Sequence, residues 1–146
     1  HLGGNMLYLW IFGNNIEDEL GHIRFLLFYL VSGYTAAYAH AVTDSTSMMP
    51  MIGASGAISG VLGAYLLLYP KARVLTLIPL GFFFQFVWVP SVFVLGFWIV
   101  IQFINGFFTY GQQVGGVAWF AHVGGFLAGM GLIFVFRRKK VRLGKK

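Results

Sequence analysis

Long runs of apolar residues, separated by short polar or Gly- and Pro-containing stretches, divide the chain into candidate membrane spans. The runs cover about residues 1–14, 23–42, 55–69, 90–108 and 117–136. A helix rises about 1.5 Å per residue, so about 20 residues cross a hydrocarbon core about 30 Å thick. The first and third runs are shorter than this length, and the other three are close to it. The pattern predicts an all-α, polytopic transmembrane helix bundle.

Two stretches between the runs differ from a simple span. Residues 13–24 are polar and include successive acidic residues at 17–19, so we expect a solvated turn and assign it no chemistry. Residues 74–108 are almost uncharged, but they are too long for one span and too short for two spans with a turn. Pro and Gly residues interrupt their first half. We therefore expect an interfacial segment followed by a loosely packed, lipid-facing span from about Pro90.

Composition and charge place the chain in a membrane and orient it. Hydrophobic residues make up 58% of the 146 residues and charged residues 10%, and the mean hydropathy of +0.78 lies outside the usual range of soluble domains. Seven of the ten basic residues lie in 137–146, directly after an apolar run. This arrangement favours a cytoplasmic tail over nucleic-acid binding. We predict a membrane domain over 1–136 and a basic cytoplasmic tail over 137–146.

Two of the predicted spans combine small residues with one polar side chain of catalytic potential. Small residues let the backbones of neighbouring membrane helices approach closely. Those that we assign to helix packing are Gly53, Gly56, Gly60, Gly125 and Gly129. Ser55 and His122 lie among them, and either one alone is more often a packing or hydrogen-bonding residue. Together they provide a nucleophile and a general base.

The first apolar run carries another polar pair, His1 and Asn5, which lie four residues apart and therefore on one helical face. Asn5 alone would be interpreted as a hydrogen-bonding link between helices, although a polar group in a membrane is by default a functional hypothesis. The acidic residues at 17–19 belong to the opposite membrane face from Ser55 and His122, so they cannot complete a triad. Asp44 is on the same side as the pair, but it belongs to a loop and is a weak candidate. A Ser/His dyad is therefore the better interpretation.

Three motifs occur in a fixed order: H-x-x-x-N at 1–5, G-A-S-G at 53–56 and A-H-x-x-G at 121–125. On hydrophobic segments, this combination resembles the rhomboid family of intramembrane serine proteases over nearly the whole chain. The resemblance implies that Ser55 is the nucleophile and His122 the general base. It also implies that His1, Asn5 and the Ser55 N–H stabilise the oxyanion. Five of the family's usual six helices would be present, because the first transmembrane helix is missing from this sequence.

The resemblance carries further expectations. The substrates would be transmembrane proteins cleaved near their outer ends, within the lipid bilayer of a bacterial cell membrane. The span from Pro90 would move to admit them from the side. Many family members have an aromatic residue four positions after the serine, where it stacks on the histidine. Ser59 stands there in this chain, so other contacts must orient His122.

Two other classes of protein remain as alternatives. A non-catalytic relative that binds transmembrane helices is the main one, although such relatives typically lack the serine or the histidine. A channel or transporter is disfavoured because no charged residue lies within a predicted span. Metal-ligand spacing is missing as well. The sequence therefore implies no metal and no cofactor, and it implies no nucleic-acid partner.

Overall fold

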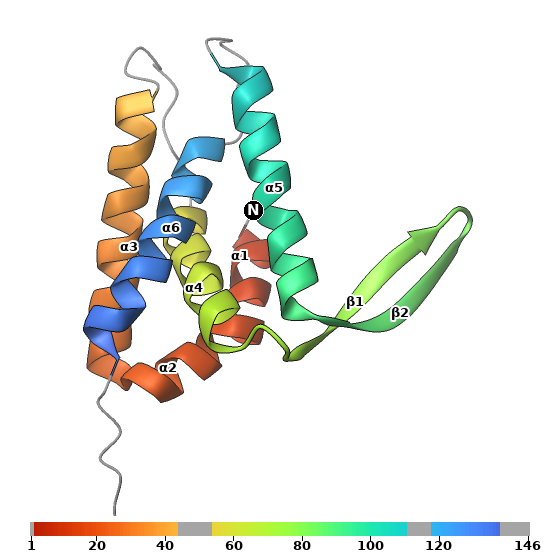
Figure 1. Ribbon diagram of the computed structural model, residues 1–146, viewed down its shortest axis with the longest axis horizontal. Helices are drawn as coiled ribbons and strands as arrows, with labels where there is room; N and C mark the ends of the chain where they lie inside the picture. The colour runs from red at the N-terminus through yellow and green to blue at the C-terminus, as the bar shows by residue number, and fades with distance from the viewer. Residues whose placement is uncertain (1, 44–53, 111–117, 138–146) are drawn as a thin grey trace, which may run out of the picture.

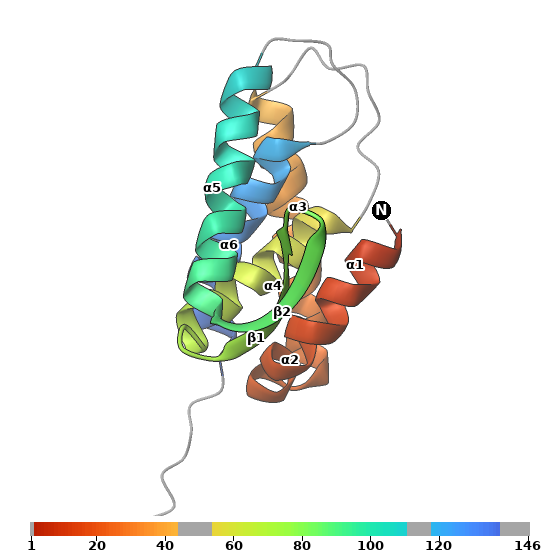
Figure 2. The same ribbon diagram turned by 90° about the vertical axis from the view of Figure 1, so that its right-hand side faces the viewer.

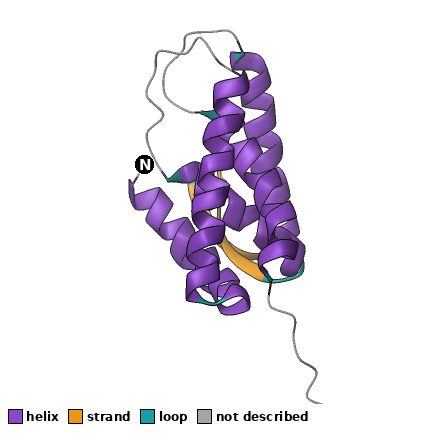
Figure 3. Cartoon of the chain, turned by 90° about the vertical axis from the view of Figure 1, so that its left-hand side faces the viewer, coloured by secondary structure: helices purple, strands orange, loops and turns teal. Residues whose placement is uncertain are grey.

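The computed structural model describes residues 2–43, 54–110 and 118–137, so His1, Gly53 and the tail from 138 lie outside the described residues. The helical elements are α1 (Leu2–Tyr8), the π-helix η1 (Leu9–Gly13), α2 (Asn14–Leu20), α3 (His22–Thr43), α4 (Ser55–Leu68), α5 (Ser91–Thr109) and α6 (Trp119–Phe136). Two strands, β1 (Arg73–Leu80) and β2 (Phe83–Pro90), lie between α4 and α5. Figure 1 shows how these elements are arranged, and Figure 3 shows that helices dominate the described chain.

The predicted polytopic helix bundle is confirmed. Within the described residues, α3, α5 and α6 are long and apolar enough to cross a membrane, and α4 is a shorter apolar helix. The bounds of all four agree with the predicted spans to within two residues. Helix α4 is the most enclosed of them, since every residue from Ala57 to Tyr65 is buried. It packs against α3, α5 and α6.

The expected turn after the first apolar run is wrong. Residues 14–20 continue as helix α2, and the chain turns only at Gly21, whose φ of 80° is accessible to glycine. The reason is a helical stripe of apolar residues: Phe12, Ile16 and Leu20 are spaced by four and are all buried. The burial of this stripe outweighs the run of acidic residues on the other faces of the helix.

The interfacial segment expected after α4 is an antiparallel hairpin, which the sequence analysis does not foresee. Its register pairs Arg73 with Pro90 at the base and Leu80 with Phe83 beside the turn, where Gly81 adopts a φ of 64°. β-branched residues alternate with leucine and proline in β1 and with aromatic residues in the second half of β2, a pattern that suits strands. Figure 1 shows the hairpin projecting to the side of the helices from a base near the end of the bundle where α2 lies, and Figure 2 shows the same hairpin in front of the helices.

Small residues let α4 and α6 meet backbone to backbone. A Cβ atom added to Gly125 or Gly129 would collide with the carbonyl oxygen of Gly56 or Gly60, respectively. Helix α3 closes on the same seam: a Cβ atom at Gly56 would lie 2.7 Å from the Cβ atom of Ala36. The packing in this three-helix seam therefore depends on the lack of side chains at these positions.

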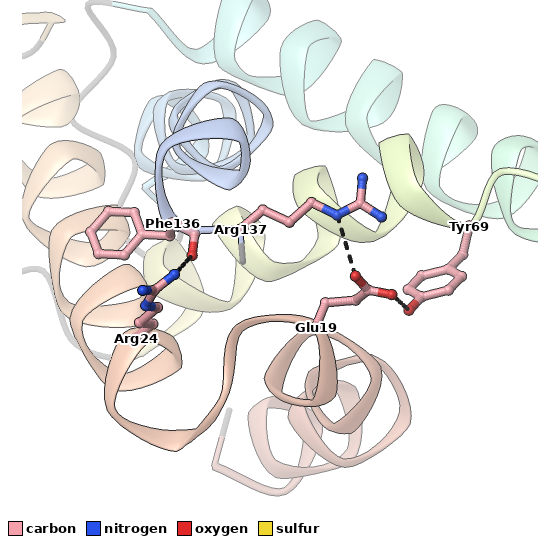
Figure 4. A network of polar contacts seen from close by, with 5 residues as sticks. All are labelled: Glu19, Arg24, Tyr69, Phe136 and Arg137. Atoms are coloured by element: carbon pink, nitrogen blue, oxygen red, sulfur yellow. Dashed lines mark hydrogen bonds and ion pairs between the residues drawn. The ribbon is translucent and has the colours of Figure 1, made fainter. Parts of the chain in front are cut away.

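Polar contacts tie the chain together at the opposite end of the bundle from the start of α4 (Figure 4). The Tyr69 hydroxyl donates to Glu19 at 3.2 Å, and the Arg137 guanidinium pairs with the same carboxylate at 3.3 Å. Arg24 donates to the carbonyl of Phe136 at 3.4 Å. Burial and the neighbouring Glu19 carboxylate raise the pKa of Tyr69, so its hydroxyl stays protonated and remains a donor.

The glycine seam yields a prediction with a matched control on the same helix. Gly129→Ala should destabilise the protein by about 1–3 kcal/mol, because the new methyl group must push α6 away from the Gly60 carbonyl. Gly131→Ala makes the same chemical change where no atom lies within 4 Å, and it should be neutral or slightly stabilising. Unfolding experiments in mixed micelles give the free energy of unfolding of both variants. Equal stability of the two variants would contradict the packing argument.

The network around Glu19 yields a second prediction. Tyr69→Phe removes one hydrogen bond to a largely buried carboxylate, and it should lower the free energy of unfolding by about 0.5–1.5 kcal/mol. Tyr38→Phe, at an exposed position of α3, is the control and should leave stability unchanged. The same unfolding experiment compares them. A Tyr69 variant as stable as the control would show that the bond contributes nothing.

Candidate active site

Ser55 and His122 come from different helices and meet through their side chains. Ser55 is the first residue of α4, and His122 lies in the first turn of α6. The Nε2 atom of His122 lies 2.9 Å from the Oγ atom of Ser55, within hydrogen-bonding distance. Both residues are half-buried. The glycine seam described above positions the two helix ends at this spacing.

The second ring nitrogen of His122 also has a partner. Its Nδ1 atom lies 2.7 Å from the Oε1 atom of Gln102, a residue of α5 that is only 6% exposed. An amide oxygen only accepts hydrogen bonds, so Nδ1 carries the proton and donates it to this bond. Nε2 is then unprotonated in the neutral imidazole, and it accepts the hydrogen bond from Ser55. This is the tautomer that a general base acting on Ser55 requires.

Aromatic rings hold the imidazole from two further sides. The ring centroid of Trp98, on α5, lies 5.7 Å from that of His122 at an interplanar angle of 37°. Trp119 approaches edge-on, with centroids 6.4 Å apart. In this chain, Trp98 and Trp119 therefore make the ring contact that the family pattern assigns to an aromatic residue on the serine helix. Ser59, which occupies that position here, is buried, and its hydroxyl donates to the Ser55 carbonyl at 2.7 Å.

The residues predicted to bind the oxyanion are only partly described. Asn5 lies on α1, which contacts α4, and its side chain is half-buried. Within the described chain, Asn5 forms no hydrogen bond with Ser55 or His122, and His1 lies outside that part. The N–H groups of the first turn of α4 have no partners within the helix, as in any helix. The Ser55 N–H is therefore placed at the positive end of the α4 dipole.

Gln102 and Trp98 are the site residues that the motifs do not reveal. They lie four apart on α5 and therefore on one face, which is turned toward His122. A signal was present, because Gln102 and Asn105 are amides within a mainly apolar span, and such residues are functional candidates by default. Among the described residues, no group of three metal-ligating side chains gathers, here or elsewhere.

Together, these features define a polytopic membrane protein that encloses a hydrogen-bonded serine and histidine. Comparison with known sequences identifies the family. The profile of the Rhomboid domain matches residues 1–139. The chain belongs to the rhomboid family.

Named relatives come from bacteria, plants and fungi. The chain is 36% identical to the rhomboid protease GluP of Bacillus subtilis over 129 residues, which are 88% of this chain and 22% of that protein. It is 32% identical to RHOMBOID-like protein 1 of Arabidopsis thaliana over 93% of this chain and 31% of the relative. Rhomboid protein 1, mitochondrial, of Saccharomyces cerevisiae is 37% identical over 51% of this chain and 23% of its own length.

The chain thus spans less than a third of the length of these relatives. No solved structure matches it.

Proposed function

We propose that this chain is the catalytic core of an intramembrane serine endopeptidase, which hydrolyses peptide bonds of transmembrane proteins with Ser55 as nucleophile and His122 as general base. The observation that carries the proposal is the 2.9 Å contact between Ser55 Oγ and His122 Nε2, with Nδ1 already engaged by Gln102. Membership of the rhomboid family and the similarity to a named rhomboid protease support the same reaction class.

The reaction follows from the protonation states of this pair. His122 Nε2 takes the hydroxyl proton while Ser55 Oγ attacks the peptide carbonyl carbon, which gives a tetrahedral oxyanion. The oxyanion collapses, the C–N bond breaks, and the imidazolium returns its proton to the leaving amine. Water then attacks the acyl-enzyme with His122 again as the base, which releases the acid and restores Ser55.

The oxyanion needs hydrogen-bond donors that are already in place. The backbone N–H of Ser55 is one, at the positive end of α4. We assign the side chains of Asn5 and His1 as the others, from the family motif. Each donor of this kind typically contributes about 3–4 kcal/mol to transition-state stabilisation.

The charge distribution gives the orientation that we propose for the protein. Arg24 and Arg137 lie at the end of the bundle remote from Ser55, and Lys71 and Arg73 follow the end of α4. By the positive-inside rule this end and the tail face the cytoplasm, and Ser55 lies toward the outer face. The substrates are then transmembrane segments cut near their outer ends, in a bacterial cell membrane.

Cleavage of a single-span substrate in liposomes by the full-length protein tests this function. Ser55→Ala and His122→Ala should each lower the rate by at least about 10³-fold, because each removes a group on which the whole chemical step depends. The measurement is the appearance of the two product fragments over time, in samples with the same amount of folded protein.

Matched substitutions elsewhere in the bundle serve as controls. Ser32→Ala and His40→Ala remove a buried serine and a histidine from α3, and both variants should cleave at rates within a few-fold of the unmodified protein. Full activity of either dyad variant would refute the role of that residue. Binding of substrates without cleavage by the unmodified protein would favour a non-catalytic helix-binding function.

A further inference from the structure

We infer that Gln102 is a positioning residue for His122: it acts as the neutral third member of a Ser55–His122–Gln102 relay and sets the tautomer of the base. The inference rests on the protease function proposed above and extends it to a residue outside the three motifs. Gln102 does not reach the hydroxyl of Ser55. It acts through the imidazole, with its Oε1 atom 2.7 Å from Nδ1.

The argument begins with the cost of burying an amide in a membrane span. Gln102 is 6% exposed, whereas large apolar residues on other faces of α5, such as Phe103 and Phe107, are mainly exposed. A buried polar group without a partner would be unfavourable by several kcal/mol in hydrocarbon. The bond to His122 satisfies the carbonyl of the Gln102 side chain. The burial of this amide is therefore explained by its contact with the imidazole.

The choice of an amide also fits the surroundings of the site. Within the described residues, the side chains that hydrogen-bond to His122 or pack against its ring as aromatic partners are Ser55, Gln102, Trp98 and Trp119, and none of them is charged. A carboxylate here would bury a charge in low dielectric. An amide oxygen fixes the same proton on Nδ1 without that cost. It gives less stabilisation to the imidazolium than a carboxylate would.

Gln102→Met tests the inference with a side chain of similar length that lacks a strong acceptor. The kcat for substrate cleavage in liposomes should fall about 10- to 100-fold with KM nearly unchanged. This loss is a part of the rate enhancement of about 10²–10⁴-fold that a general base contributes. Leu95→Met, a buried apolar position on the same helix, is the matched control and should keep kcat within about three-fold. A Gln102→Met variant with the kcat of the control would overturn the inference.

Gln102→Glu distinguishes positioning from general packing. It keeps an acceptor oxygen at the same place but adds a group that favours the imidazolium, so the acid limb of the kcat profile should move to higher pH by about one unit. Among the titratable side chains of the described residues, Tyr38 and His40 of α3 and Tyr110, directly after α5, lie toward the same end. An unchanged acid limb would contradict contact between position 102 and the base.

The imidazole ¹⁵N chemical shifts of His122, assigned by comparison with His122→Ala, give a readout that needs no proteolysis. The unmodified protein should show Nδ1–H, and Gln102→Met should lose this preference. If the unmodified protein shows no Ser55-dependent cleavage, the proposed function fails, and the shifts alone decide the role of Gln102. Nε2–H in the unmodified protein would overturn the inference.

A separate observation concerns the hairpin β1–β2. Paired residues of antiparallel strands share a face, and one face carries only apolar side chains beyond its basal pair. This apolar face consists of Leu75, Leu77, Pro79, Phe84, Phe86 and Trp88. The large side chains on it are between 49% and 71% exposed. The other face includes Thr76 and Gln85.

We further propose that the apolar face of the hairpin lies in the interfacial region of the cytoplasmic leaflet and contacts lipid. Strand β2 runs directly into α5, whose exposed Val92, Phe93 and Phe97 continue the apolar surface. Lys71 and Arg73 at the base suit anionic headgroups. A two-stranded hairpin leaves backbone groups unpaired on its outer edges, which excludes the centre of the hydrocarbon core and favours a shallow position.

The chain has no cysteine, so a spin label at Phe84→Cys reports on one position. In phosphatidylcholine–phosphatidylglycerol vesicles, the label should collide more with oxygen than with a water-soluble nickel chelate. Asp18→Cys, on the exposed face of α2, is the control and should show the reverse. A Phe84 label that behaves like the control would overturn the proposal. Dipolar broadening between labels, with low access to both reagents, would identify a second copy as the partner and overturn it as well.

Discussion

Backbone contact between α4 and α6 is the constraint on which the candidate site depends. Gly125 and Gly129 lie so close to the carbonyl groups of α4 that no side chain fits between the helices. The bond between Ser55 and His122 spans the same seam, one turn closer to the start of α6, and measures 2.9 Å. Hydrogen bonds weaken rapidly beyond about 3.2 Å. A separation of one ångström at the glycines would therefore remove the contact between Ser55 and His122.

This dependence reflects how membrane helices associate. Lipid chains are as apolar as the side chains they replace, so close packing and a few polar contacts hold the bundle together. Small residues supply the packing along α3, α4 and α6. Polar contacts add to the stability of the bundle, and those of Glu19 with Tyr69 and Arg137 lie at one end. The site and the polar network therefore belong to one scheme, in which the spans are joined at both ends of a glycine-lined seam.

How far the sequence predicts the fold depends on which forces act within one segment. The four spans from His22 to Phe136 are predicted nearly to the residue because uninterrupted apolar runs define them. Helix α2 is missed because successive acidic residues obscure the stripe of Phe12, Ile16 and Leu20, and the hairpin is missed because strand pairing depends on a partner. The pairing of Gln102 with His122 depends on the rotation of α5 about its own axis, which no spacing within α5 specifies.

Helix α5 connects His122 to the outside of the bundle. It presents large aromatic side chains outward, yet it also supplies Gln102 and Trp98 to the imidazole. Its start is fixed, since the Ser91 hydroxyl donates to the Tyr69 carbonyl and the Ser91 N–H donates to Ala72. The later part of α5 packs on α6, where a Cβ atom added to Gly106 would lie 3.2 Å from the Cβ atom of Trp119. A displacement of α5 that separated Gln102 from Nδ1 would also release the tautomer of His122, so the position of α5 and the proposed role of His122 are linked through one amide.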